Sequence, residues 1–161
     1  MNFARQVART LDDEHRANLE LLGRLERVLA RRDEASRREL PALGSALQRQ
    51  LGEEIGRHFG FEEQQSFARM DEAGDGDLAT LLTEEHDSLR EVAAELEPLA
   101  AALAAGTLRQ ADEPAFQRLA GEWIERMVAH IQKETMALLP LLDDLLDDAS
   151  DRELAFAYAC R

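Results

Sequence analysis

Four long segments of the chain repeat apolar residues at intervals of three, four and seven positions, and only short stretches interrupt them. In the first segment the repeat runs through Val7, Leu11, His15, Leu19, Leu22 and Leu29. This spacing places the apolar side chains on one face of an amphipathic helix. Ala, Leu, Glu and Arg, which favour helices, dominate the composition, and the chain holds only 9 Gly and 4 Pro. The sequence therefore predicts an all-α protein.

The pattern predicts helices over residues 2–32, 37–70 and 78–105, a fourth helix with Pro114 in its first turn, and a short last helix over 150–159. Short loops between long helices favour antiparallel neighbours. We therefore expect an up-down-up-down four-helix bundle with a short C-terminal helix, formed as a single domain over residues 1–161. A chain of this length can bury one sizeable core.

A few residues indicate where these helices begin, bend and end. Ser36 fits the N-cap of a capping box, and Pro41 marks an alternative start for the second helix. A loop rich in Gly and Asp is predicted over residues 71–77, and Gly106 suits the end of the third helix. Pro140 is expected to kink the fourth helix.

Acidic residues outnumber basic ones, with 33 Asp and Glu against 19 Lys and Arg and a net charge of −14. Such a surface repels phosphate backbones and anionic lipid heads, which argues against nucleic acid and membrane partners. The N-terminus lacks the apolar stretch of a signal peptide, and no segment approaches the length of a membrane span. Cys160 is the only cysteine, so no internal disulfide is expected. These features predict a cytoplasmic protein.

All four histidines fall on the predicted inward faces of the helices. His58 is followed four residues later by Glu62, and His130 is followed four residues later by Glu134. Residues four apart lie on the same face of a helix, so each pair points an imidazole and a carboxylate in one direction. The other two histidines, His15 and His86, have no such partner on their own helix.

These residues form two copies of one unit, a helix with a lone histidine and then a helix with a His-x-x-x-Glu pair. The lone histidines are 71 residues apart, and the paired histidines are 72 residues apart. Two such hairpins related by a two-fold axis would bring the six residues to the bundle centre. Imidazole suits iron, zinc, copper and nickel, and six ligands exceed the needs of one tetrahedral zinc. The set fits two metals that share both glutamates.

With His15, His58-x-x-x-Glu62, His86 and His130-x-x-x-Glu134, the chain resembles the hemerythrin-like, or HHE cation-binding, domain family. The resemblance covers residues 5 to 145, roughly. It implies a four-helix bundle with a non-heme di-iron centre bridged by oxide or hydroxide. It further implies that His15 and His58 hold one iron, that His86 and His130 hold the other, and that Glu62 and Glu134 bridge them.

The chain departs from oxygen-carrying hemerythrin at two positions. Leu82 stands where that group has a further histidine, and Glu134 follows His130 after four residues instead of an aspartate after five. The missing imidazole is expected to leave a more open and more symmetric centre. The resemblance therefore favours bacterial HHE proteins that sense oxygen or nitric oxide, handle peroxide or supply iron, and not reversible oxygen carriers.

The leading hypothesis is a soluble, non-enzymatic protein that binds two iron ions and a small diatomic or peroxide ligand. One alternative is a catalase- or peroxidase-like enzyme at the same centre. Another is a helical interaction module that holds zinc or no metal. Zinc or manganese could substitute for iron, because imidazole and carboxylate accept several metals. A protein partner or a homodimer is compatible with each of these hypotheses.

Other side chains receive simpler interpretations. Glu54, four residues before His58, is predicted to be a solvated or helix-paired acid, with an acceptor for an imidazole N–H as the alternative. Tyr158 and Cys160 are placed on the C-terminal tail, where no role is assigned to the phenol and the thiol is expected to be free. Packing is expected of Phe61, Phe67, Trp123 and Met127.

Overall fold

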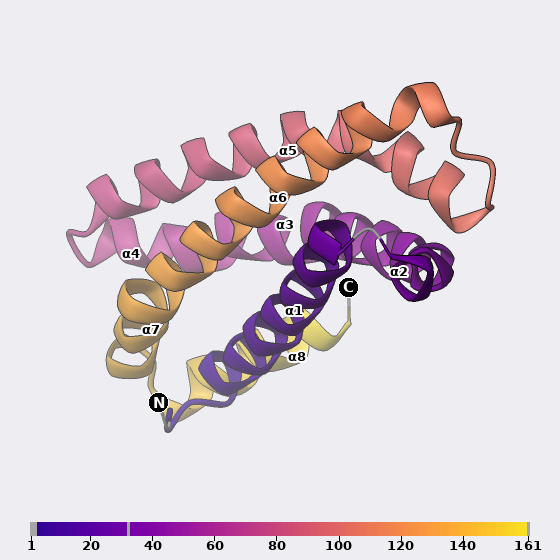
Figure 1. The fold of residues 1–161 in the computed structure, drawn as a ribbon. Helices are drawn as coiled ribbons and strands as arrows, with labels where there is room; N and C mark the ends of the chain where they lie inside the picture. Colours follow the sequence, from indigo (N-terminus) through magenta and orange to yellow (C-terminus); the bar gives the residue numbers. More distant parts are fainter. Residues whose placement is uncertain (1–2, 32, 161) are drawn as a thin grey trace.

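The computed structural model describes residues 3–31 and 33–160, which form four long helical rods and a short C-terminal helix (Figure 1). The first rod is α1 (Gln6–Arg31), and the third is α5 (Gly76–Ala104). The second rod runs continuously through α2 (Glu34–Glu53), η1 (Glu54–His58), α3 (Phe59–Phe61), η2 (Glu62–Ser66) and α4 (Phe67–Glu72). The fourth runs through α6 (Glu113–Lys133), η4 (Glu134–Leu138) and α7 (Leu139–Leu145), after the 3₁₀ turn η3 (Gln110–Asp112).

The rods pack as an up-down-up-down four-helix bundle. Helix α1 contacts α2 and α6, and α5 contacts α2 and α6, so each rod has two antiparallel neighbours. The last helix, α8 (Asp148–Ala159), lies along α1 and runs in the same direction (Figure 1). No strand occurs in the described residues. The predicted all-α bundle with a short C-terminal helix is thus confirmed.

Two apolar clusters fill the bundle, one on each side of a buried polar layer. One cluster includes Leu25, Leu47 and Trp123, and the other includes Leu11 and Leu142. Each rod changes from one cluster to the other at the position of a buried histidine or glutamate. Burial of apolar area on both sides contributes roughly 25 cal/mol per Å², which lets the fold hold polar groups in its middle.

The first helix begins later than predicted. It starts at Gln6, because the buried carboxylate of Asp151 on α8 accepts hydrogen bonds from the backbone N–H groups of Gln6 and Val7, at 2.8 and 2.9 Å. A side chain distant in sequence thus caps this helix and satisfies two of its free donors. The predicted ends at Asn2 and Arg32 lie outside the described residues.

The predicted N-cap of the second helix, Ser36, is wrong. Asp33 caps the helix instead, because its carboxylate accepts a hydrogen bond of 2.7 Å from the Ser36 N–H, and the helix begins at Glu34. Pro41 lies inside the helix and does not start it. Asp147 caps α8 in the same way by accepting a hydrogen bond of 2.8 Å from the Ser150 N–H. That helix therefore begins at Asp148, two residues before the predicted start.

The loops follow the predicted glycines. Gly74 and Gly106 adopt φ values of 96° and 68°, a left-handed conformation that glycine adopts without strain. The turn between the second and third rods is shorter than the predicted 71–77, because α4 continues to Glu72 and α5 starts at Gly76. Pro114 occupies the first turn of α6 as predicted, and Pro140 occupies the first turn of α7 after a π-helical segment.

None of the helices in the described part of the chain combines the length and the apolar character needed to cross a membrane.

Candidate metal centre

The structure brings all six predicted ligands into the polar layer of the bundle. His15 lies on α1, His86 on α5 and His130 on α6, while His58 ends η1, and Glu62 and Glu134 begin η2 and η4. Each of the six residues is at most 2% exposed. Their ligand atoms form two groups, each within 4.8 Å, that share both glutamates: His15, His58, Glu62 and Glu134; and Glu62, His86, His130 and Glu134.

Short π-helical segments adjoin three of the candidate ligands. His58 is the last residue of η1, Glu62 is the first of η2, and Glu134 is the first of η4. Such wider turns are rare and often occur at functional sites. The stretch from His130 to Glu134 keeps the α-helical hydrogen bond between these two residues, so the pair stays on one face as the spacing predicted.

Each glutamate directs one oxygen to each half of the centre. The Oε1 atom of Glu62 lies 3.1 Å from His58 Nε2, and its Oε2 lies 3.4 Å from His86 Nε2. Glu134 mirrors this arrangement, with Oε2 lying 3.1 Å from His15 Nε2 and Oε1 lying 2.9 Å from His130 Nε2. This geometry is suited to two carboxylates that each span a pair of cations.

The donor atoms at the centre require positive charge between them. Both oxygens of Glu62 and of Glu134 are buried and accept no hydrogen bond in the structure. The Nε2 atoms of His86 and His130 face each other at 3.0 Å. Burying two carboxylates without compensation is costly, so protons or metal ions must lie among these atoms. Four imidazole nitrogens and four carboxylate oxygens are a donor set that fits transition metals.

The sequence model of the hemerythrin HHE cation-binding domain matches residues 6–142. The chain belongs to this family. A search of curated proteins finds no match to it. Membership implies that the chain binds a cation, and the two groups of buried histidines and glutamates lie within the matched residues. Helix α8 follows the matched residues.

Three of the four imidazoles in this HHE domain use their second nitrogen to contact a carboxylate. The Nδ1 atoms of His86 and His130 each lie 2.9 Å from a carboxylate oxygen, and that of His58 lies 3.2 Å from one. The acids are Glu63 for His86, Glu85 for His130 and Glu14 for His58. Such partners fix the ring orientation and make the imidazole a stronger ligand.

Each of these three acids also pairs with a nearby cation at the edge of the bundle. Arg90 lies 2.8 Å from Glu63, Arg57 lies 2.7 Å from Glu14, and Lys133 contacts Glu85. Helical periodicity does not point to these acids. A signal was present, because each acid is adjacent in sequence to a candidate ligand but supports a histidine on a neighbouring rod.

His15 differs from the other three histidines. Its Nδ1 lies 3.1 Å from the hydroxyl of Thr135, the residue that follows Glu134. A hydroxyl accepts a hydrogen bond without carrying charge, so it supports the imidazole less strongly than a carboxylate does.

Helix α8 brings Tyr158 to the centre, although the sequence placed this residue on the tail. Its ring is buried between Phe61, at 4.6 Å between centroids, and the guanidinium of Arg57, at 4.6 Å from the ring centroid. The phenol donates to Oε2 of Glu14 and lies 3.3 Å from His58 Nδ1. Cys160, two residues later, is an exposed free thiol as expected.

Glu54 is not the solvated acid that its position suggested, because it is buried at 4% exposure. Its Oε1 accepts from Asn18, whose Oδ1 accepts from Gln50 at 3.1 Å, and Gln50 accepts from the Trp123 indole N–H at 3.1 Å. These hydrogen bonds run from Trp123 to the carboxylate of Glu54, which interacts electrostatically with His58.

Aromatic rings enclose the other half. Phe59 stacks on His86 with 3.9 Å between ring centroids and 10° between the planes, and Phe67 lies 5.4 Å away from the same ring. The sequence assigned packing to Phe67, which is buried, but did not identify Phe59. These rings hold the imidazole in place and keep the His86–His130 half apolar.

Neighbouring charges and burial shift the pKa values of several candidate ligands. Burial acts to lower the pKa of His130, but the charge of Glu134 raises it to about 10. Burial likewise opposes protonation of His58, yet Glu62 and Glu54 raise its pKa well above the usual value. Burial acts to raise the pKa of Glu134, but His130 holds it well below the usual range. His58 and His130 therefore favour their protonated forms at neutral pH when no cation replaces the protons.

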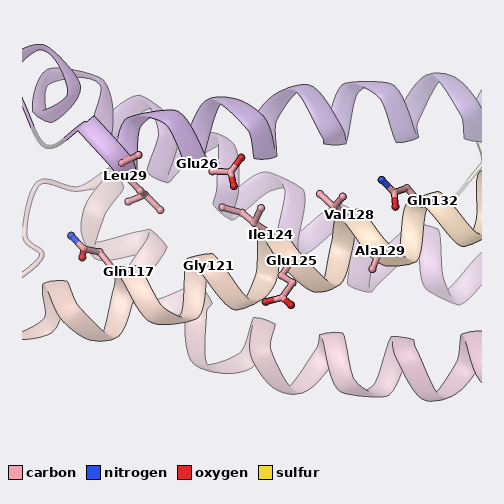
Figure 2. Close-up of a pocket in the computed structure, with 10 residues that line it drawn as sticks. Glu26, Leu29, Gln117, Gly121, Ile124, Glu125, Val128, Ala129 and Gln132 are labelled. Atoms are coloured by element: carbon pink, nitrogen blue, oxygen red, sulfur yellow. The ribbon is translucent and has the colours of Figure 1, made fainter.

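A groove of about 730 Å³ lies between α1 and α6 on the surface of the bundle (Figure 2). Leu29 of α1 and Val128 of α6 are among the side chains that line it, and none of the six candidate ligands does. The candidate metal centre is therefore distinct from this groove.

Proposed function

We propose that this HHE domain binds two iron ions through His15, His58, Glu62, His86, His130 and Glu134, and that the pair binds oxygen, nitric oxide or peroxide or serves to supply iron. The observation that carries the proposal is the pair of overlapping donor groups that share both glutamates. Two imidazoles and one oxygen from each glutamate are available to each metal.

With four protein donors at each position, iron keeps room for a further ligand and a structural zinc does not. Four protein donors complete a tetrahedral zinc site, whereas a metal that prefers six ligands keeps exchangeable positions. A bound iron pair would supply redox chemistry and an open position for a small ligand. The residues around it hold the imidazoles by their Nδ1 atoms and bury the ligands to 2% exposure or less. This burial favours a ligand of two or three atoms over a larger substrate.

The proposal is tested by the metal content and absorption spectrum of the protein loaded with iron. We expect two irons per chain and absorption in the near ultraviolet and visible. Glu134→Ala should lose most of the iron, since this residue contacts both halves. Glu125→Ala is the matched control, because it makes the same change at an exposed position of the same rod that does not belong to either donor group. Two irons in Glu134→Ala, or a silent spectrum with zinc bound, would contradict the proposal.

Peroxide distinguishes a binding protein from an enzyme at the same centre. A single stoichiometric oxidation of the anaerobically loaded protein is expected for the binding protein that we propose. Oxygen evolution over many turnovers would instead support a catalase-like enzyme. The four imidazoles are all within the donor groups, so both functions would require the same six residues.

A further inference from the structure

The partners of the imidazoles obey the same two-fold repeat as the ligands, with one exception. Glu14 and Glu85 each precede a lone histidine and support the paired histidine on the next rod. Glu63 follows Glu62 and supports His86. The equivalent position after Glu134 holds Thr135, which supports His15. A threonine therefore stands at the one position where the repeat would place a glutamate.

The exception weakens one imidazole. The Glu63 carboxylate lies 2.9 Å from His86 Nδ1, whereas the Thr135 hydroxyl lies 3.1 Å from His15 Nδ1. A charged acceptor draws the Nδ1 proton more strongly and leaves more electron density on Nε2, the atom that faces the centre. His15 is therefore expected to be a weaker metal ligand than His86.

The second imidazole of this half is also less strongly supported. Glu14 approaches His58 Nδ1 at 3.2 Å, but the same Oε2 atom accepts the phenol proton of Tyr158. The acid that supports His130 lies closer, at 2.9 Å, and its cation contacts the other carboxylate oxygen. Competition for one oxygen reduces the share of its charge that reaches His58. Arg90 contacts the Glu63 oxygen that supports His86 in the same way, so this comparison distinguishes His58 from His130, and the difference between His15 and His86 rests on Thr135.

We propose that the two metal positions are unequal, so that the His86–His130 position fills first and the His15–His58 position holds the exchangeable metal. Thr135 and Tyr158 are positioning residues that set this difference. Both glutamates contribute one oxygen to each position, so they do not account for it. Loss of a partner of this kind changes metal affinity by about 10- to 100-fold, so we expect the two positions to differ about tenfold. The inference rests on the proposed two-metal site.

The order of filling is measured by titrating the metal-free full chain with Zn²⁺, which is diamagnetic. Nitrogen NMR of the histidine side chains follows each imidazole, and calorimetry gives the two affinities. At one equivalent we expect the Nε2 signals of His86 and His130 to shift, and those of His15 and His58 to shift with the second. Simultaneous shifts of all four, or His15 and His58 shifting first, would overturn the inference. Failure to bind two ions, with no imidazole shifting, would instead refute the metal site itself.

Substitutions at the repeat positions provide a test by direction. Thr135→Glu restores the repeat and should tighten the second binding step about tenfold, while Glu63→Thr should weaken the first by a similar factor. Tyr158→Phe keeps the ring but frees Glu14, so it should also tighten the second step. If a substitution acted only by loosening the packing, it would weaken binding in every variant. A tighter second step in Thr135→Glu and Tyr158→Phe therefore indicates an effect on the partner of the imidazole.

Thr80→Glu is the control for added charge, because Thr80 is exposed and makes a hydrogen bond only to the backbone of its own helix. Its second step should match that of the unmodified protein. Circular dichroism confirms that each variant is folded. If Thr135→Glu does not fold, Glu63→Thr still tests the inference through the first binding step. An unchanged or weaker second step in folded Thr135→Glu and Tyr158→Phe would overturn the role of these residues.

Discussion

The His86–His130 half of the centre and the His15–His58 half contain the same ligand types but have different surroundings. Stacked phenylalanines and two carboxylates enclose the first, in which Phe59 lies parallel to the His86 ring. A hydroxyl, a shared carboxylate and a chain of buried amides surround the second, which helix α8 covers with Tyr158. A duplicated ligand pattern thus does not guarantee equal surroundings for the two halves, because the partners of the candidate ligands come from other helices.

The largest difference is expected when one imidazole is removed from each half. His15→Ala should keep about one metal per chain, because the tighter His86–His130 position stays intact. His130→Ala removes a ligand from that position and should keep less than one after the same desalting step. Metal analysis of loaded and desalted protein measures both values. Equal retention in the two variants would show that the halves are equivalent.

The second-largest difference is expected in how much the packing around each half contributes to the free energy of unfolding. Phe59→Ala removes the ring that stacks on His86 and should lower the free energy of unfolding by about 3–5 kcal/mol, as large truncations in a core do. Gln50→Leu, behind the other half, leaves the Trp123 N–H without its acceptor and should cost about 1–3 kcal/mol. Urea denaturation of the metal-free proteins measures both changes.

The control for these two variants is Gln48→Leu, which removes only the exposed hydrogen bond to Glu97 and should change stability by less than about 0.5 kcal/mol. A larger loss in Gln50→Leu than in Phe59→Ala would mean that the polar chain, and not the aromatic wall, contributes most to the stability of the centre.

The smallest effects should appear in the pH dependence of the metal-free protein. The pKa of His130 is raised from 6.5 to about 10, so its stabilisation is complete below pH 6.5 and is lost as the pH rises toward 10. Burial acts to raise the pKa of Glu14, but hydrogen bonds from His58 and Tyr158 lower it from 4.5 to about 2. That stabilisation is complete above pH 4.5 and is lost as the pH falls toward 2.

Stability of the metal-free protein should therefore be greatest between pH 4.5 and 6.5. His130→Gln should flatten the loss on the alkaline side, and Glu14→Gln should flatten the loss on the acid side. Urea midpoints measured across the pH range test both. Bound metal should remove the alkaline loss, because it replaces the protons on the imidazoles. An alkaline loss of the same size in the loaded protein would contradict a metal site at these histidines.

Spacing along single helices predicted much of the fold. It also predicted that the six candidate ligands face the middle of the bundle. The 71- and 72-residue offsets between equivalent histidines reflect two hairpins, and the structure places their six side chains in one layer. Helix ends were predicted less well. Ser36 was chosen as an N-cap where Asp33 serves, since both residues can cap and only the backbone conformation decides between them.

The partners of the ligands were missed because they act between rods. The periodicity of its own helix does not predict the role of Glu85, which supports His130 on the next rod. The role of Tyr158 depends on α8 lying along α1, an arrangement that Asp151 stabilises by capping the first helix from the far end of the chain. Glu54 was expected in solvent, and its burial depends on amides contributed by two other positions.

Residue type and spacing were enough to define an acidic helical bundle with two imidazole–carboxylate pairs and two lone imidazoles on its inner faces, because a helix fixes which side chains share a face. The inequality of the two halves required the folded chain. Hydrogen bonds to Nδ1 and ring stacking act over 3 to 4 Å between helices. The repeat in the sequence does not show which side chains of neighbouring helices come that close.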